Sequence, residues 1–190
     1  IEQVRLAAPQ FHRNNKWFKW ALSTFPTTAP LIQRYISEIQ EVDKGIGYLI
    51  NELSRRRVHH KTAYFITSDH GENLGEHHLF FHHGGLYRET VHVPLIIRLP
   101  HTSAKREHKL VQTIDIAPTI LELTNIPAWP KMRGHSLIPL IQGRSMGRTF
   151  VYSEHMQAQL TSIRSASATL ILHHKTTLQF PSYPIRRGQI

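Results

Sequence analysis

The feature that most constrains the fold is a short apolar run that leads directly into an Asp-His pair. Residues 62–67 are rich in aromatic and β-branched side chains, which is typical of a strand covered on both faces. Asp69 and His70 follow at once, in a loop punctuated by Gly71 and Gly75. A carboxylate beside an imidazole at a strand end is typical of metal sites. The pattern predicts a strand that delivers metal ligands into a loop.

Chemically versatile side chains are concentrated around this pair. Asp69 is one of three aspartates in 190 residues, and six of the fifteen histidines lie between His70 and His92. The chain has no cysteine, which excludes a disulfide framework, a thiolate metal site and a cysteine nucleophile within these residues. The absence of cysteine leaves the cellular compartment undetermined.

The net charge of +10 favours anionic partners, so nucleic acid has to be weighed beside sulfate and phosphate esters. The charge is scattered, however, and its densest cluster, residues 55–61, is expected between a helix and a strand, where a solvated turn is favoured over a polyanion site. Neither an aromatic-rich RNA-binding pattern nor a Cys/His finger accompanies it. No apolar stretch approaches the roughly 18 residues of a membrane span. We expect no nucleic-acid partner.

Hydrophobic spacing predicts the main elements. Apolar residues recur at intervals of three and four across residues 30–53, which predicts an amphipathic helix with Pro30 in its first turn. Gly45 and Gly47 within it are expected to mark close packing against a sheet. Residues 1–28 show no clean period and are expected to be rich in loops.

The elements after the Asp-His loop complete the pattern. A second apolar run covers residues 92–100, with Pro94 at its start or at a bulge. A helix is predicted over residues 115–123 with Asp115 as its N-cap, and short strands near residues 150–152 and 162–172. The order helix, strand, long loop, strand, helix predicts an α/β domain with a mixed, mostly parallel sheet between helices. In such sheets ligands gather beyond the carboxyl ends of strands.

Several short motifs follow one another in a fixed order between about residues 30 and 155. They are Val42-Asp43 and Gly47, Thr67-Ser68-Asp69-His70-Gly71-Glu72, Leu74-Gly75-Glu76-His77, His83-Gly84-Gly85-Leu86-Tyr87, Val93-Pro94-Leu95-Ile96-Ile97-Arg98, Val111 to Thr119, Gly134-His135-Ser136-Leu137 and Val151-Tyr152-Ser153-Glu154. Together they resemble the sulfatase family of the alkaline phosphatase superfamily. Several motifs that agree in order are far more specific than any single one.

The resemblance implies a divalent metal site at Asp69 and His70. In the family, the matching carboxylate and the adjacent Asn or His bind a cation, usually calcium, beside the nucleophile. Histidine is a poorer ligand for calcium than an amide oxygen. The alternatives for His70 are therefore a hydrogen bond to the substrate's oxyanion, or a softer ion such as zinc or manganese.

The resemblance also implies a cationic or hydrogen-bonding residue a few positions before Tyr87, where it contacts the sulfate. His83 is favoured for this substrate-binding and catalytic role, and His82 is the second candidate, because imidazole can lend a proton near neutral pH. His77 and His78 are expected to be loop residues that pack with Phe80 and Phe81. Glu72 and Glu76 are expected to be hydrogen-bonding scaffold, and the acidic group of Asp115 a helix cap, so all three stay outside the catalytic set.

The family's nucleophile is a formylglycine made from Cys or Ser in a Cys/Ser-x-Pro-x-Arg motif well upstream of the Asp-His segment. We expect this chain to contain neither such a cysteine nor such a serine motif, and two further metal aspartates of the family have no counterpart. We therefore expect residues 1–155 to be the later part of a sulfatase catalytic domain, and residues 156–190 the beginning of a C-terminal subdomain with a small antiparallel sheet, or a tail.

The resemblance implies a sulfuric ester hydrolase that cleaves small anionic sulfate monoesters, with this chain inactive by itself. Two alternatives stay open within the same superfamily. One is a phosphonate or phosphodiester hydrolase, which shares the Asp-His-Gly segment, and the other is a sulfatase-like protein without catalysis. The sequence indicates neither the group that carries the sulfate nor the oligomeric state.

Overall fold

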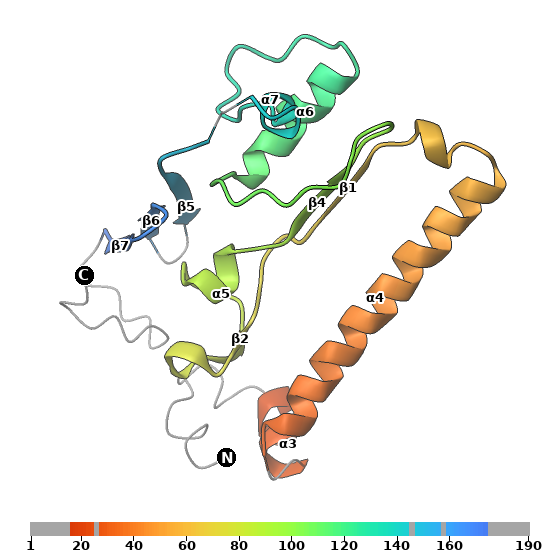
Figure 1. Cartoon of the computed structure of the whole chain (residues 1–190). Helices are drawn as coiled ribbons and strands as arrows, with labels where there is room; N and C mark the ends of the chain where they lie inside the picture. The colour runs from red at the N-terminus through yellow and green to blue at the C-terminus, as the bar shows by residue number, and fades with distance from the viewer. Residues whose placement is uncertain (1–15, 25–26, 145–146, 157–158, 175–190) are drawn as a thin grey trace. The chain divides into compact units, whose positions relative to one another are not determined.

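The computed structural model describes residues 16–24, 27–144, 147–156 and 159–174 (Figure 1). The described residues form two compact units, 16–103 and 104–174. None of the helices in these ranges combines the length and apolar character that crossing a bilayer requires. The expected boundary between residues 155 and 156 stays a prediction.

The first unit begins with two helices, α3 (Lys16–Thr24) and α4 (Ala29–Arg55). The long helix α4, orange in Figure 1, confirms the apolar period, and Pro30 lies in its first turn as predicted. The loop-rich prediction for residues 1–28 is wrong over α3, and residues 1–15 lie outside the described part of the chain. Between Lys16 and Thr24 no glycine or proline interrupts the backbone, and the apolar residues recur at a helical period, so a helix can form there.

The apolar stripe of α4 is uncovered by the described residues. Leu31 is buried, but Val42 is 63% exposed and Tyr48 75%. A Cβ atom added at Gly45 or Gly47 would meet no atom within 4 Å. The prediction that these glycines pack closely against a sheet is therefore wrong for the described residues, because nothing among them covers this part of the helix.

The predicted strands on either side of the Asp-His loop form one antiparallel pair. Strand β1 (Tyr64–Thr67) pairs with β4 (Leu95–Arg98), with Phe65 opposite Ile97 (Figure 1). Pro94 directly precedes β4, as predicted, and its carbonyl oxygen accepts a hydrogen bond from Thr67 Oγ1 at 2.8 Å. Every strand pair within the described ranges is antiparallel, so the predicted parallel pairing is not found among them.

The short 3₁₀ helix η1 (His59–Lys61) leads from α4 toward β1. Arg98 in β4 donates to the carbonyl oxygens of His59 and Thr62, at 3.2 and 3.4 Å, and its guanidinium lies over the Tyr64 ring. These contacts attach the turn to the strand pair. Within the basic cluster at residues 55–61, the His59 carbonyl oxygen thus takes part in the fold. Arg55 and Arg56 both pair with Glu52.

The loop between β1 and β4 has structure of its own. It contains β2 (Asn73–Leu74), the 3₁₀ helix η2 (Glu76–His78), β3 (Phe80–His82) and the short helix α5 (Arg88–Val91). Strands β2 and β3 pair antiparallel, and Leu79, which lies between them in the chain, is buried. The candidate site is built on this folded loop.

The second unit contains the 3₁₀ helix η3 (Thr113–Asp115), helices α6 (Ile116–Leu123) and α7 (Ile138–Ile141), and a three-stranded antiparallel sheet. The sheet order is β5 (Val151–His155), β6 (Leu160–Arg164), β7 (Thr169–His173). This sheet is the small antiparallel sheet that the sequence predicts, and it starts before residue 156.

Asp115 is the polar centre of the second unit rather than the simple N-cap that the sequence predicts. Its side chain is 1% exposed and makes no capping bond to α6. The carboxylate instead accepts hydrogen bonds from the backbone N–H groups of Gln112 and His135 and forms an ion pair with Arg148. The sequence indicates that a helix starts near Asp115. It does not indicate His135 and Arg148 as partners, because only the tertiary structure brings them to Asp115.

Candidate metal and substrate site

The site begins where β1 ends and the chain turns at Ser68. Ser68 Oγ donates to the His70 carbonyl oxygen at 2.6 Å, and the His70 N–H donates to Asp69 Oδ1 at 2.9 Å. These local bonds fix the turn and leave the Asp69 side chain 85% exposed. The backbone N–H of His70, which donates to this carboxylate, is the largest cause that holds the pKa of Asp69 below the usual value. The carboxylate is therefore ionised and accessible to a cation.

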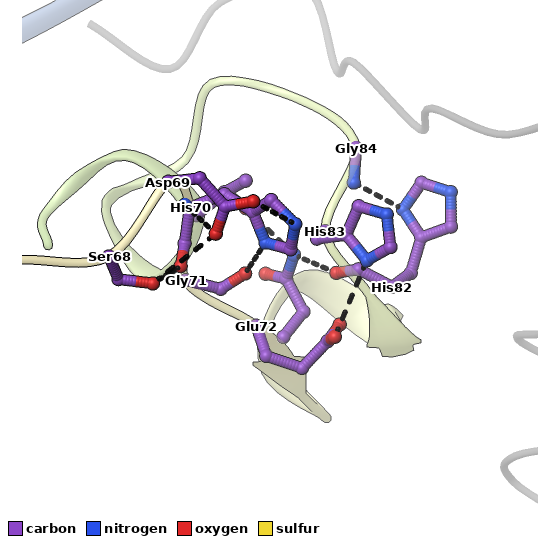
Figure 2. Close-up of polar contacts among 10 residues, drawn as sticks. Ser68, Asp69, His70, Gly71, Glu72, His82, His83 and Gly84 are labelled. Atoms are coloured by element: carbon purple, nitrogen blue, oxygen red, sulfur yellow. Dashed lines mark hydrogen bonds and ion pairs between the residues drawn. The ribbon is translucent and has the colours of Figure 1, made fainter. Parts of the chain in front are cut away.

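His70 presents its second ring nitrogen to the same place. Its Nδ1 lies 2.9 Å from the Gly71 carbonyl oxygen, which can only accept, so Nδ1 carries a proton, and in the neutral imidazole Nε2 then has the lone pair. Nε2 lies 3.7 Å from Asp69 Oδ2 (Figure 2). One cation at the usual ligand distances of about 2.0–2.6 Å can contact both atoms at this separation.

Asp69 and His70 thus fit a divalent metal as part of its ligand set. Zinc takes about four ligands and calcium about six to eight. Within the described ranges no group of three or more His, Cys, Asp or Glu residues could hold a metal. The pair can supply two donors of a larger set, and the identity of the metal stays a prediction.

The structure brings His83 to this pair. The rings of His83 and His70 stack with their centroids 4.2 Å apart and an angle of 20° between their planes, and the His83 side chain is 60% exposed (Figure 2). His82 lies one residue earlier at the end of β3, where its Nδ1 accepts the Gly84 N–H at 3.0 Å. The contact with His70 favours His83 for the predicted substrate role, which itself stays a prediction.

Backbone contacts hold the two arms of the loop together. The Gly71 N–H donates to the Thr90 carbonyl oxygen at 2.8 Å. Asn73, whose side chain is fully buried, donates from Nδ2 to the His82 carbonyl oxygen at 2.7 Å and to Thr90 Oγ1 at 3.0 Å. These hydrogen bonds connect the segment after His70 to the segment before His83 and to α5.

Gly71 occupies a position that no side chain can share. A Cβ atom added there would lie 2.0 Å from the Glu89 carbonyl oxygen, so Gly71→Ala must displace backbone. We expect this substitution to lower the free energy of unfolding of the first unit by about 1–3 kcal/mol, measured by urea denaturation. Gly45→Ala is the matched control, because its Cβ would be unobstructed in a helix and should stabilise by up to about 1 kcal/mol. Equal effects of the two substitutions would contradict the packing at Gly71.

His77 has a larger role in the loop than the sequence predicts. Its ring stacks on Tyr87 with centroids 3.8 Å apart, and its Nε2 lies 3.3 Å from Glu89 Oε2. Its backbone has a φ angle of 55°, in the left-handed region that residues other than glycine seldom adopt. Burial raises the pKa of the Tyr87 hydroxyl. The sequence predicted contacts of His77 with Phe80 and Phe81, and no local signal in the sequence indicated Tyr87 as its partner. The side chain of His78 lies outside the described part of the chain.

Glu72, left out of the catalytic set, lies directly at the site. Its Oε2 is 3.5 Å from His83 Nδ1 (Figure 2). Glu76, in the same loop, accepts the Leu74 N–H at 2.8 Å and is scaffold as predicted. The two glutamates look alike in the sequence, because the contact of Glu72 with His83 depends on how the loop folds back.

One match to the nucleophile spacing was missed in the sequence. Residues 182–186 read Ser-Tyr-Pro-Ile-Arg, which satisfies Ser-x-Pro-x-Arg, but they follow Asp69 instead of preceding it. They lie outside the described residues. The order of motifs therefore still differs from that expected of a complete sulfatase active site.

Comparison with known proteins identifies the family. A family model described as Sulfatase matches residues 6–126, and a model described as N-sulphoglucosamine sulphohydrolase, C-terminal, matches residues 75–179. Arylsulfatase K of Gallus gallus is 34% identical over 108 residues, which cover 56% of this chain and 20% of that protein. The extracellular sulfatase SULF-1 homolog of Drosophila melanogaster is 29% identical over 143 residues, covering 70% of this chain and 13% of the homolog.

Solved structures agree with the sequence matches. Phosphonate monoester hydrolase SpPMH from Silicibacter pomeroyi matches with a TM-score of 0.63 and 27% identity, over 70% of this chain and 30% of that chain. BT4656, solved in complex with its substrate D-glucosamine-2-N,6-O-disulfate, matches with a TM-score of 0.60 and 27% identity, over 73% of this chain and 31% of that chain.

The chain belongs to the sulfatase family, as the motif order predicted. Over the matched part it has the fold of the sulfatase structures in the alkaline phosphatase superfamily. The chain spans about a fifth of the length of Arylsulfatase K.

Proposed function

We propose that the intact protein hydrolyses sulfate monoesters and that this chain supplies the metal-binding and substrate-facing part of its active site. The observation that carries the proposal is the cluster of Asp69, His70 and His83, in which two potential metal donors face each other and a third side chain stacks against them. The family match supports sulfate ester hydrolysis as the reaction class.

Asp69, His70 and His83 can take different roles in this reaction. The ionised Asp69 carboxylate and the free Nε2 lone pair of His70 would hold a divalent cation, for which we propose calcium, with zinc or manganese as alternatives. When bound, the cation would neutralise negative charge on the ester oxygens. His83 would contact the ester through the ring atom that faces away from Glu72, Nε2, and exchange a proton there.

We also propose that the nucleophile, further metal ligands and parallel neighbours of β1 come from residues that this 190-residue chain does not contain. The chain has no cysteine, its one Ser-x-Pro-x-Arg match follows the Asp-His segment, and its relatives are several times longer. On this proposal residues 1–155 belong to the catalytic domain. The 190-residue chain alone should then show no aryl-sulfate hydrolysis above an Asp69→Ala control, and activity that Ser182→Ala removes would contradict it.

His83 and His82 can be distinguished by substitution in the intact protein. We expect His83→Ala to lower kcat for an aryl sulfate by about 10²–10⁴-fold, because it removes a positioned proton donor or acceptor. His82→Ala is the matched control, and we expect it to lower kcat by less than about 10-fold, measured under saturating substrate. The opposite order of effects would assign the substrate role to His82.

A phosphonate or phosphodiester hydrolase is the second candidate function. The observation that favours it is the likeness to the phosphonate monoester hydrolase SpPMH, which has a TM-score of 0.63. The cluster of Asp69, His70 and His83 has no feature that separates a sulfuryl from a phosphoryl centre. Assays of both ester classes on the same preparation decide between the two.

A further inference from the structure

The carboxylate of Glu72 lies beside the Nδ1 atom of the His83 ring. Glu72 Oε2 is 3.5 Å from His83 Nδ1, and the Glu72 side chain is 18% exposed whereas that of His83 is 60% exposed. Figure 2 shows the two side chains pointing toward each other across the folded loop. Glu72 is thus a mostly buried acid in contact with a residue that faces the site.

The position of Glu72 is fixed by both of its neighbours in the chain. Gly71 is bonded through its N–H to the Thr90 carbonyl oxygen, and Asn73 is bonded through Nδ2 to the His82 carbonyl oxygen. The second bond connects the strand that follows Glu72 to the residue that precedes His83. The backbone on both sides of Glu72 and the backbone directly before His83 are therefore anchored by hydrogen bonds.

Scaffold hydrogen bonding does not account for this carboxylate. Glu72 Oε1 is buried and has no hydrogen-bond partner among the described residues, although an unsatisfied buried acceptor costs about 1–3 kcal/mol. Glu76, in contrast, uses its carboxylate to accept a backbone N–H. A buried acceptor left without a partner is uncommon in folded proteins and calls for a specific explanation.

We propose that Glu72 is a positioning residue that fixes the ring orientation and tautomer of His83. An ionised carboxylate can only accept, so its contact favours the proton on His83 Nδ1 and leaves Nε2 as the atom that meets the ester. His70 packs against one face of the same ring, so the contact with Glu72 and the stacking together define the plane. The catalytic part of this inference rests on the proposed function.

The tautomer can be measured directly in the chain labelled with ¹⁵N-histidine. Two-bond ¹⁵N–¹H correlation spectra at about pH 8.5, where free imidazole is neutral, distinguish Nδ1–H from Nε2–H rings. A His83→Asn sample identifies the His83 signals. We expect Nδ1–H in the wild type and in Glu76→Gln, and a shift toward Nε2–H in Glu72→Met, which keeps the volume but has no acceptor. Glu72→Gln retains an acceptor oxygen and should keep most of the Nδ1–H form.

Two results would overturn the inference: an Nε2–H ring at His83 in the wild type, or an unchanged Nδ1–H ring in Glu72→Met. The wild-type spectrum decides even where the methionine variant fails to fold. In the intact protein, Glu72→Met should lower kcat about 10–100-fold with KM nearly unchanged, as for other residues that orient a functional histidine, and Glu72→Gln should restore part of the loss. Absence of any sulfatase activity would defeat the proposed function but leave the tautomer result standing.

Discussion

Replacing Asp69 by alanine in the intact protein should lower kcat/KM for an aryl sulfate by about 10³-fold or more. The substitution removes a proposed ligand of the divalent cation that would neutralise negative charge on the ester oxygens. The carboxylate is kept ionised by its neighbours and lies open to a cation. Its Oδ2 and the Nε2 of His70 are the two donors that can share one ion. The same substitution should reduce the bound metal, measured by elemental mass spectrometry on the purified protein.

Asp43→Ala is the matched control for this experiment. Asp43 is an exposed aspartate within α4, so its loss changes the net charge by the same amount without touching the loop. We expect its activity and metal content to stay within about twofold of the wild type, as for most exposed substitutions. An Asp69→Ala protein that keeps its metal and its activity would contradict the assignment of Asp69 as a ligand.

Asp115→Ala should lower the free energy of unfolding of the second unit by about 3–5 kcal/mol, because it leaves the largely buried Arg148 without its counter-charge. It also removes the acceptor for the N–H groups of Gln112 and His135. Urea denaturation at neutral pH measures the loss. Glu122→Ala, an exposed acid on α6, is the matched control and should change stability by less than about 0.5 kcal/mol.

The stability that Asp115 provides should also depend on pH. Burial alone would raise the pKa of Asp115, but hydrogen bonds from Arg148, His135 and Gln112, and the Arg148 charge, outweigh it and hold the pKa below the usual 3.8. A lowered folded-state pKa means that the stabilisation is complete well above 3.8 and is lost as the pH falls from about 5 through that lowered value. The wild type should therefore lose more stability than Asp115→Ala over this interval, and parallel pH curves would contradict the account.

A double substitution separates the ion pair from the rest of the Asp115 network. Removing both Asp115 and Arg148, as Asp115→Ala with Arg148→Met, should cost less than the sum of the two single changes, because no buried charge is then left alone. Strict additivity would show that the two side chains act independently.

The elements predicted correctly are those whose signal is local. The period of apolar residues across α4 and the short apolar runs of β1 and β4 each determine their own conformation, so their existence could be read from the sequence. The pairing of β1 with β4 could not, because strand direction depends on neighbours and on the path of the loop between them. The helix α3 was missed because its helical period extends over only nine residues, in a segment of mixed aromatic and basic residues.

Some contacts of the candidate site were also predictable from the sequence, and others depend on the tertiary fold. Asp69 and His70 are adjacent in the chain and follow a strand, so their meeting was predictable from the sequence alone. The stacking of His83 on His70 and the contact of Glu72 with His83 arise where the loop folds back through β2 and β3. The buried position of Asp115 likewise requires Arg148, which is distant in the sequence. Residue types indicated the chemistry, and the tertiary path decided which residues take part.

The measurement that tests the central claim most directly is a paired assay of the intact protein on an aryl sulfate and on an aryl phosphonate or phosphodiester, with added calcium and an Asp69→Ala control. We expect kcat/KM for the sulfate to exceed that for the phosphorus esters, and the Asp69→Ala protein to lose the sulfate activity. Hydrolysis of the phosphorus esters alone, or sulfate hydrolysis that survives in Asp69→Ala, would contradict the claim that this loop is half of a sulfatase active site.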